Sequence, residues 1–220
     1  MRSIERSCRH CYATAAIDRP EPWGRRRRDR GGPARPRSGR GAVNPRHWGT
    51  DRADELRACP GSRFAPDPVE RWLRAIEIDA PVAVVFRWLC QMRVAPYSYD
   101  LLDNRGRRSP RRLTPGVEEL QAGQEFMTIF TLVDYQRDAY LTLEMTSERG
   151  LRAFGPFIVV YDVEPLAGGR TRLRATLLVG DKAKDGAIDA ARRRVLAWGD
   201  LAMMRRQLLT FKALAEGGPR

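Results

Sequence analysis

The spacing of apolar residues changes along the chain and predicts an order of strands and helices. Apolar residues alternate over 70–79, which predicts a strand, and they recur at helical spacing over 82–92, after a proline that suits a helix start. A second short helix is expected over 97–104. Beyond Gly123 the period becomes two, which predicts further strands over 125–134, 139–146, 157–164 and 171–179.

The last predicted element is a long helix over 188–215, ended by glycines and a proline. Its apolar residues share one narrow sector of the helical wheel and predict the stripe that covers a sheet: Ala197, Leu201, Met204, Leu208, Phe211 and Ala215. Successive hairpins predict an antiparallel sheet with one covered face and one face in contact with water. The expected fold class is α+β, with a curved sheet wrapped around the C-terminal helix.

Three stretches in this order resemble one known superfamily. They are RAIEIDAPVAVVFRWLCQM at 74–92, APYSYDLLDN at 95–104 and WGDLAMMRRQL at 198–208. Together they are similar to a bacterial branch of the SRPBCC superfamily, which includes START, birch-pollen-allergen and polyketide cyclase/dehydrase proteins. The resemblance covers about 47–215 and implies the helix-grip fold, with two short helices after the first strand. The expected organisation is an extension at 1–46, a lead-in segment at 47–69, the helix-grip domain at 70–216 and a tail at 217–220.

The resemblance also implies a deep cavity between the sheet and the C-terminal helix, used in the superfamily for apolar small molecules or lipids. Inward positions of the strands and one face of the helix would line it, and methionine and phenylalanine suit an adaptable apolar pocket. The same residues could instead fill a solid core. The candidates are Phe126, Thr128, Phe130, Leu143, Phe157, Val159, Tyr161, Leu177, Met203, Met204 and Gln207.

Several polar residues are candidates for contact with a ligand. Asp200 and Gln207 are seven residues apart and so lie on one side of the helix, although that side could equally border solvent. Tyr97, Tyr99 and Asp100 are expected near the cavity mouth, where a tyrosine beside a carboxylate can act as a general acid or simply cap a helix. The basic loop over 105–115 could bind an anionic group or be solvated.

The sequence offers little for catalysis. The predicted domain has no histidine beyond His47 at its edge, which excludes a histidine-dependent triad, and no glycine-rich phosphate loop is present. The primary hypothesis is therefore a binding protein for an apolar or aromatic small molecule or lipid. The alternative is a cyclase- or dehydratase-like enzyme that uses Tyr99 and Asp100 as acid–base groups. No cofactor is expected, and the oligomeric state stays open.

The cysteines give no clear metal site or disulfide. Cys8 and Cys11 have the spacing of half a zinc site, but the second pair of ligands is missing. Cys90 falls among apolar helical residues and is expected in the core, whereas Cys59 is isolated. Without a disulfide framework a cytoplasmic location is expected. No apolar run approaches the roughly 20 residues of a membrane span.

The net charge of +13 is concentrated at the N-terminus, since residues 1–46 carry 13 arginines and four acidic residues. This segment is rich in proline and glycine and is expected to be disordered. It could bind nucleic acid by neutralising phosphates, which is the one place where nucleic-acid binding is expected. Alternatively, because arginine outnumbers lysine 37 to 3, it could be GC-rich upstream DNA translated in frame, with the true start at Val43.

Mass spectrometry of the N-terminus of the native protein separates these alternatives. If translation starts at Val43, no peptide from before that residue should be found, and a peptide from 1–42 would refute this start. If the segment is a nucleic-acid-binding arm, deleting 1–42 should abolish strong, salt-dependent binding. Binding that persists without the segment would contradict that role.

Overall fold

A computed structural model describes residues 44–65, 67–99, 106, 108–180 and 187–217. Residues 1–43 of the basic N-terminal segment, with Cys8 and Cys11, and most of the expected helix over 97–104 lie outside these ranges. The helices are α1 (Arg52–Leu56), α2 (Val82–Cys90), α4 (Glu148–Phe154) and α5 (Ala187–Glu216), with short 3-10 helices η1 (Pro60–Phe64), η2 (Gln91–Arg93) and η3 (Ala167–Gly169). The strands are β1 (His47–Trp48), β2 (Glu70–Ile78), β3 (Glu125–Phe126), β4 (Phe130–Gln136), β5 (Tyr140–Met145), β6 (Phe157–Leu166) and β7 (Arg170–Val179).

The described strands form one open sheet of seven strands in the order β1-β2-β7-β6-β5-β4-β3. Neighbouring strands are antiparallel except β1, which pairs in parallel with β2 through His47 and Trp48. The sheet is therefore mixed, and the expectation of a purely antiparallel sheet is wrong at this edge. The reason is that the lead-in segment, expected only to precede the domain, itself contributes a strand.

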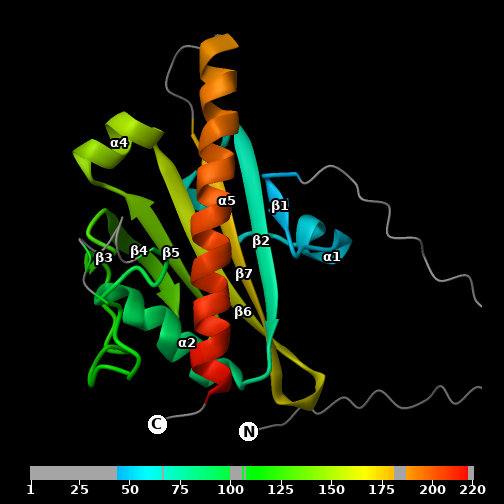
Figure 1. Ribbon diagram of the computed structural model, residues 1–220, viewed down its shortest axis with the longest axis vertical. Coiled ribbons are helices and arrows are strands. Elements are labelled where there is room, and N and C mark those ends of the chain that lie inside the picture. The colour runs from blue at the N-terminus through cyan, green and yellow to red at the C-terminus, as the bar shows by residue number, and fades with distance from the viewer. Residues whose placement is uncertain (1–43, 66, 100–105, 107, 181–186, 218–220) are drawn as a thin grey trace, which may run out of the picture. The chain divides into compact units, whose positions relative to one another are not determined.

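Helix α5 lies along the inner face of the sheet, as Figure 1 shows. The predicted stripe is confirmed, because all six of its apolar residues are buried and all except Leu201 belong to the core cluster formed with the sheet and α2. The inward residues of β6 and β7 pack beneath this stripe, among them Val163, Leu173 and Ala175. The long helix and the strands 70–78, 157–166 and 170–179 thus agree with the sequence pattern. Within the described residues, no helix is long and apolar enough to cross a membrane.

One predicted strand is split by a tight turn. The strand expected over 125–134 is two strands, because Phe126 pairs with Phe130 in an antiparallel hairpin. Met127 and Thr128 between them have φ of 49° and 61° and reverse the chain. The turn itself is rich in apolar residues, since 126–130 read FMTIF, and no glycine marks the left-handed positions. The pattern alone therefore could not show the reversal.

Two other helix expectations need correction. Tyr97–Tyr99 is not helical, and Tyr97 has a φ of 59° because its ring is packed between Trp88 and Phe211. Helix α4 was not predicted. It begins after Ser147 and is followed by Gly155, which has a φ of 84°. A serine N-cap and a glycine after the last turn are the usual signals of a short helix, so both were present in the sequence.

The lead-in segment covers part of the outer face of the sheet, whereas Glu77 and Glu144 on the same face are exposed to water as predicted. Cys59 and Ala65 pack on an apolar patch of Ile158, Val160 and Leu178. Beside this patch the Arg174 side chain is only 5% exposed and pairs with Asp54 of α1, Asp162 and Glu164. The acidic partners compensate the guanidinium charge, which is why an arginine can be buried on a face predicted to be wet.

Gly49 fixes the position of β1 against β2. Its φ of +69° is left-handed, and an added Cβ would lie 2.1 Å from the backbone oxygen of Ala75. Only glycine allows this approach without displacing a main-chain group. Gly168 has a similar φ of +77° but open space around the position of a Cβ.

The pair Gly49→Ala and Gly168→Ala separates backbone strain from steric displacement. Each variant carries the strain of a left-handed alanine, about 1 kcal/mol. We expect Gly49→Ala to lose about 1–3 kcal/mol more in the free energy of unfolding, because β1 must move away from β2. Urea unfolding monitored by circular dichroism measures the difference. Equal losses for the two variants would contradict the close approach.

Candidate functional site

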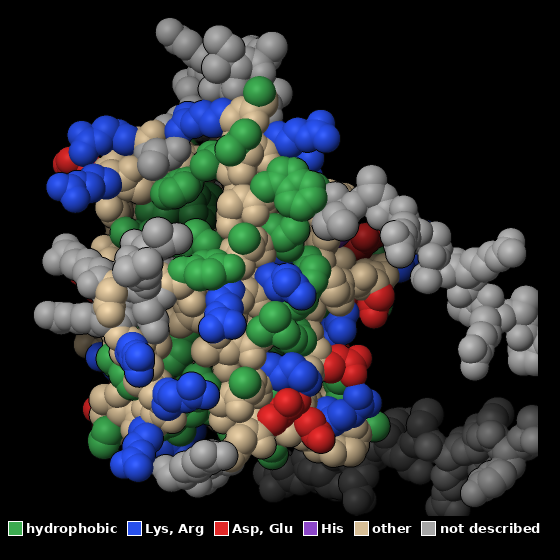
Figure 2. Space-filling model, in the orientation of Figure 1, with side chains coloured by type: hydrophobic (Ala, Val, Ile, Leu, Met, Phe, Trp, Pro, Cys, Tyr) green, Lys and Arg blue, Asp and Glu red, His purple; other side chains and the backbone are tan. Residues whose placement is uncertain are grey.

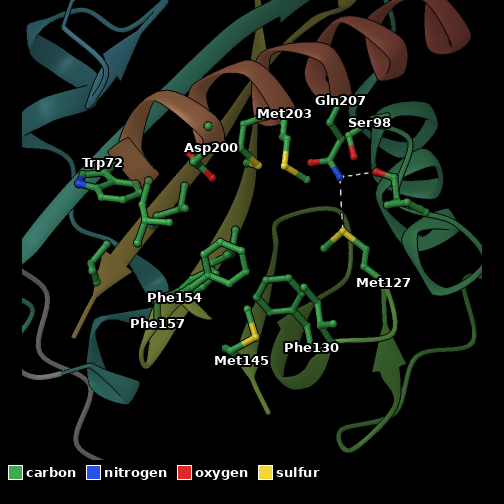
Figure 3. A pocket seen from close by; sticks show the side chains of 18 of the residues that line it. Trp72, Ser98, Met127, Phe130, Met145, Phe154, Phe157, Asp200, Met203 and Gln207 are labelled. Carbon is green, nitrogen blue, oxygen red and sulfur yellow. Dashed lines mark hydrogen bonds between the residues drawn. The ribbon is translucent and has the colours of Figure 1, made fainter. Parts of the chain in front are cut away.

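A cavity of about 340 Å³ lies between the inner face of the sheet and α5. Figure 2 shows a hollow with apolar walls beside α5, and Figure 3 shows side chains converging on the cavity from both layers. Its walls come from β2, β4–β7, α4, α5 and the loops at 96–98 and 127–129. The lining residues are Trp72, Pro96, Ser98, Met127, Ile129, Phe130, Met145, Phe154, Phe157, Val159, Tyr161, Leu177, Val179, Arg193, Val195, Leu196, Gly199, Asp200, Met203, Met204 and Gln207.

Most of the candidates chosen from strand alternation and the helical wheel lie on this cavity. Strand residues alternate between the two faces of a sheet, so a correct register puts every second one inside. Helical residues three, four and seven apart share a side in the same way. The candidates found on the cavity are Phe130, Phe157, Val159, Tyr161, Leu177, Asp200, Met203, Met204 and Gln207.

The remaining candidates lie elsewhere. Tyr97 is buried, with its hydroxyl donating to the Pro110 carbonyl oxygen at 2.8 Å, and Phe126 and Leu143 are fully buried in the core. Thr128 is exposed in the turn before β4. Tyr99 is 42% exposed and does not line the cavity, whereas Asp100 is outside the described residues.

Several lining residues were not predicted, because the sequence pattern did not indicate the helix and the turn that carry them. Phe154 reaches the cavity from α4, and Met127 and Ile129 reach it from the unexpected turn. Met145 was the last inward position of a predicted strand and could have been found from the alternation. Gly199 lies one turn before Met203 on the cavity side of α5, which its spacing indicates.

One polar group of the cavity is satisfied by the protein itself. Tyr161 Oη donates to Gln207 Oε1 at 2.6 Å, and Gln207 Nε2 donates to the Pro96 carbonyl oxygen at 2.6 Å and to Met127 Sδ at 3.4 Å. Figure 3 shows the last two contacts as dashed lines. Burial raises the pKa of Tyr161, so its hydroxyl stays protonated and keeps donating. This network joins α5 to β6 and to the loop after η2.

The second polar group is an ion pair. Arg74 is fully buried, and its Nη2 donates to Asp200 Oδ2 at 2.8 Å. The same guanidinium donates to the carbonyl oxygens of Pro45, Arg46 and Leu73 at 2.7–3.0 Å. Burial raises the pKa of Asp200 to about 6, and the positive charge of Arg74 opposes that rise.

A further group of charges lies beside this pair. Glu70 accepts from Arg46 Nε at 2.7 Å and from Trp72 Nε1 at 2.7 Å, and its carboxylate lies 3.3 Å from Arg193 Nε. The hydrogen bond from Arg46 is the main cause of a lowered pKa for Glu70. Two carboxylates at one end of the sheet thus have opposite shifts, because Glu70 has strong donors and Asp200 is mainly desolvated.

The remaining chemistry of the described residues is sparse. No group of three or more histidine, cysteine or acidic side chains among them could hold a metal ion. Cys90 is buried, as predicted, and burial raises the pKa of its thiol to about 12, so it is not a thiolate at neutral pH. Cys59 is a half-buried free thiol.

Comparisons with known proteins do not identify the chain. No protein-family model and no curated protein matches it. Solved structures give weak likenesses. A protein from Mesorhizobium loti has 13% identity and a TM-score of 0.42 over 69% of this chain and 100% of its own. A protein from Nitrosomonas europaea has 14% identity and a TM-score of 0.42 over 69% of this chain and 99% of its own. The Aha1 dimer from Colwellia psychrerythraea has 13% and 0.37 over 68% and 98%. Likenesses at this level assign no function.

We expect the Asp200 carboxyl to titrate near pH 6, and that of Glu70 below its ordinary range. Because the pKa of Asp200 is higher in the folded chain than in the unfolded one, its contribution to stability is complete below about pH 4. That contribution is lost as the pH rises through about 6. Carboxyl ¹³C NMR, with Asp200→Asn for assignment, measures the midpoint. A midpoint near 4 would contradict the burial of this group.

Proposed function

We propose that the chain is a helix-grip protein of the SRPBCC type that binds an apolar or aromatic small molecule or lipid between the sheet and α5. The observation that carries the proposal is the cavity of about 340 Å³ between the inner face of the sheet and α5. Ligand pockets of proteins commonly start near this size and are apolar with a few placed polar groups. The open sheet and the long C-terminal helix support the fold assignment.

The composition of the walls supports an apolar ligand. Four methionines (127, 145, 203 and 204) and three phenylalanines (130, 154 and 157) line the cavity. Methionine side chains are flexible and polarisable, so they adapt to ligands of different outline. An apolar ligand would also restore the dispersion contacts that an empty space of this size forfeits. Retention of such a space in an otherwise packed core is therefore consistent with a binding role.

The proposal is binding without catalysis. Tyr99, one of the two acid–base candidates, is exposed and away from the lining, and Asp100 is not described, so this pair gives the enzyme alternative no support. The polar groups on the cavity that are described in detail, Gln207 and Asp200, each hold a structural hydrogen bond. A cytoplasmic location belongs to the same proposal and agrees with the free thiol of Cys90.

Gly199 allows a direct test, because an added Cβ there meets nothing within 4 Å and the residue lines the cavity from a helix. We expect Gly199→Phe to fill part of the cavity and to weaken binding of the fluorescent apolar amine N-phenyl-1-naphthylamine at least tenfold. Gly199→Ala is the matched control and should bind within about twofold of the wild type. Both should melt at or above the wild-type temperature, since glycine inside a helix costs about 0.5–1 kcal/mol relative to alanine.

Fluorescence titration measures the affinities, and circular dichroism checks the fold. Equal binding by the three proteins would place the dye elsewhere and remove this support. Native mass spectrometry of the protein from its source cells, followed by solvent extraction, provides an independent test. A stoichiometric apolar molecule is the expected result.

A further inference from the structure

The polar atoms around the cavity are unequally satisfied. Gln207 and Tyr161 bond to each other, and the amide of Gln207 donates to the Pro96 carbonyl, so this network needs nothing from a ligand. Asp200 differs, because Arg74 binds only its Oδ2 atom, and Oδ1 accepts no hydrogen bond from a described residue. The Asp200 side chain is 20% exposed and extends from α5 toward the cavity (Figure 3).

Arg74 determines what kind of group this oxygen can bind. Its guanidinium is fully buried and lies 2.8 Å from the carboxylate, so the charge of Asp200 is compensated inside the protein. A ligand ammonium would therefore be the only uncompensated charge of the three. A ligand carboxylate would place a second negative oxygen beside Oδ1, where repulsion opposes it. An uncharged O–H or N–H donor satisfies the oxygen without either penalty.

An apolar ligand without such a donor would also be penalised. It would cover Oδ1 and remove it from water without replacing the lost hydrogen bond. Leaving a buried polar atom unsatisfied costs more than a hydrogen bond typically gains, and the cost is larger for a charged group. Of the other lining residues, Met203, Met204 and Leu177 offer no donor, and the guanidinium of Arg193, which also lines the cavity, lies 3.3 Å from the carboxylate of Glu70.

We propose that the cavity selects an apolar ligand with one uncharged hydrogen-bond donor, such as an alcohol, a phenol or an amide, which donates to Asp200 Oδ1. This selectivity rests on the proposed binding function. The ligand's polar end lies against the middle of α5. Its apolar body extends over Phe130, Phe157 and Met145 on the sheet.

A matched pair of probes tests the selectivity on the wild-type chain. The probes are 1-decanol and 1-methoxydecane, which differ in the hydroxyl donor, with decanoate as the anionic comparison. Each displaces N-phenyl-1-naphthylamine from the protein at about pH 8, where Asp200 is ionised. Hydrogen bonds to charged groups are among the stronger ones, so we expect 1-decanol to bind roughly 10- to 100-fold more tightly than 1-methoxydecane. Decanoate should bind more weakly than 1-decanol.

Two further measurements assign the preference to Asp200. Lowering the pH to about 5 protonates this carboxyl and should narrow the difference between the probes. Of the groups that interact with it, Arg74 on β2 stays charged and Tyr161 on β6 stays neutral, so neither titrates in this range. Asp200→Asn can keep an oxygen toward Arg74 and present its amide N–H to the ligand. It should remove or reverse the preference in favour of 1-methoxydecane.

The outcomes separate this inference from the proposed function. If none of the probes displaces the dye and no apolar compound binds, the proposed function itself fails. If the alcohol and the ether bind equally, or decanoate binds most tightly, the selectivity is overturned while the binding function stands. Should Asp200→Asn fail to fold, the wild-type pair at the two pH values still decides the question.

Discussion

The buried guanidinium of Arg74 is the interaction on which the arrangement of the cavity depends. It sits on the inner face of β2 and is bonded at once to the carbonyl oxygens of Pro45 and Arg46 just before β1, to its own strand and to α5. A buried charge needs hydrogen-bond partners and a nearby counter-charge, and both terminal nitrogens of Arg74 have such partners, whereas its Nε has none among the described residues. The folded chain must therefore bring Pro45, Arg46 and Asp200 to one point. This requirement fixes the edge strand β1 and the position of α5 along the sheet together.

A second set of contacts holds α5 at a distance from the sheet. The Gln207 amide bridges Tyr161 on β6 and the carbonyl of Pro96, at a level of the helix two turns beyond Asp200. From Gln207 toward the C-terminus, the helix packs closely through Leu208 and Phe211. From Gln207 toward the N-terminus, large and flexible side chains border the cavity. The cavity therefore lies where the two polar contacts position the helix and apolar packing does not close the gap.

The period of apolar residues predicted the elements that are long and apolar on one side. β2, β6, β7 and α5 were predicted because each is long and presents a mainly apolar face, and many lining residues followed from the register. The turn at Met127 and Thr128 was not predicted, because it is rich in apolar residues and contains no glycine. The position of Tyr99 could not be predicted, because it depends on the path of the loop after η2 and not on a repeating pattern. One feature of the sequence indicates that Arg74 is buried: it lies between Trp72 and Ile76 on the apolar side of a strand. Its partner on α5 could not be identified from spacing, because the pair joins residues 126 positions apart.

The sheet has buried arginine–carboxylate contacts on both faces, but the two differ in what they leave unsatisfied. On the outer face, Arg174 is surrounded by Asp54, Asp162 and Glu164, and Arg172 also pairs with Asp54, so the acids there are engaged by the lead-in segment and by neighbouring strands. On the inner face, Arg74 binds one oxygen of Asp200, and Asp200 lines the cavity. A cluster of charges whose only role is to join helices and strands could satisfy its polar atoms within the protein, and the outer cluster nearly does so. The half-satisfied carboxylate is instead placed where a ligand can complete it, so the contact that positions α5 also presents the polar end of the proposed binding site.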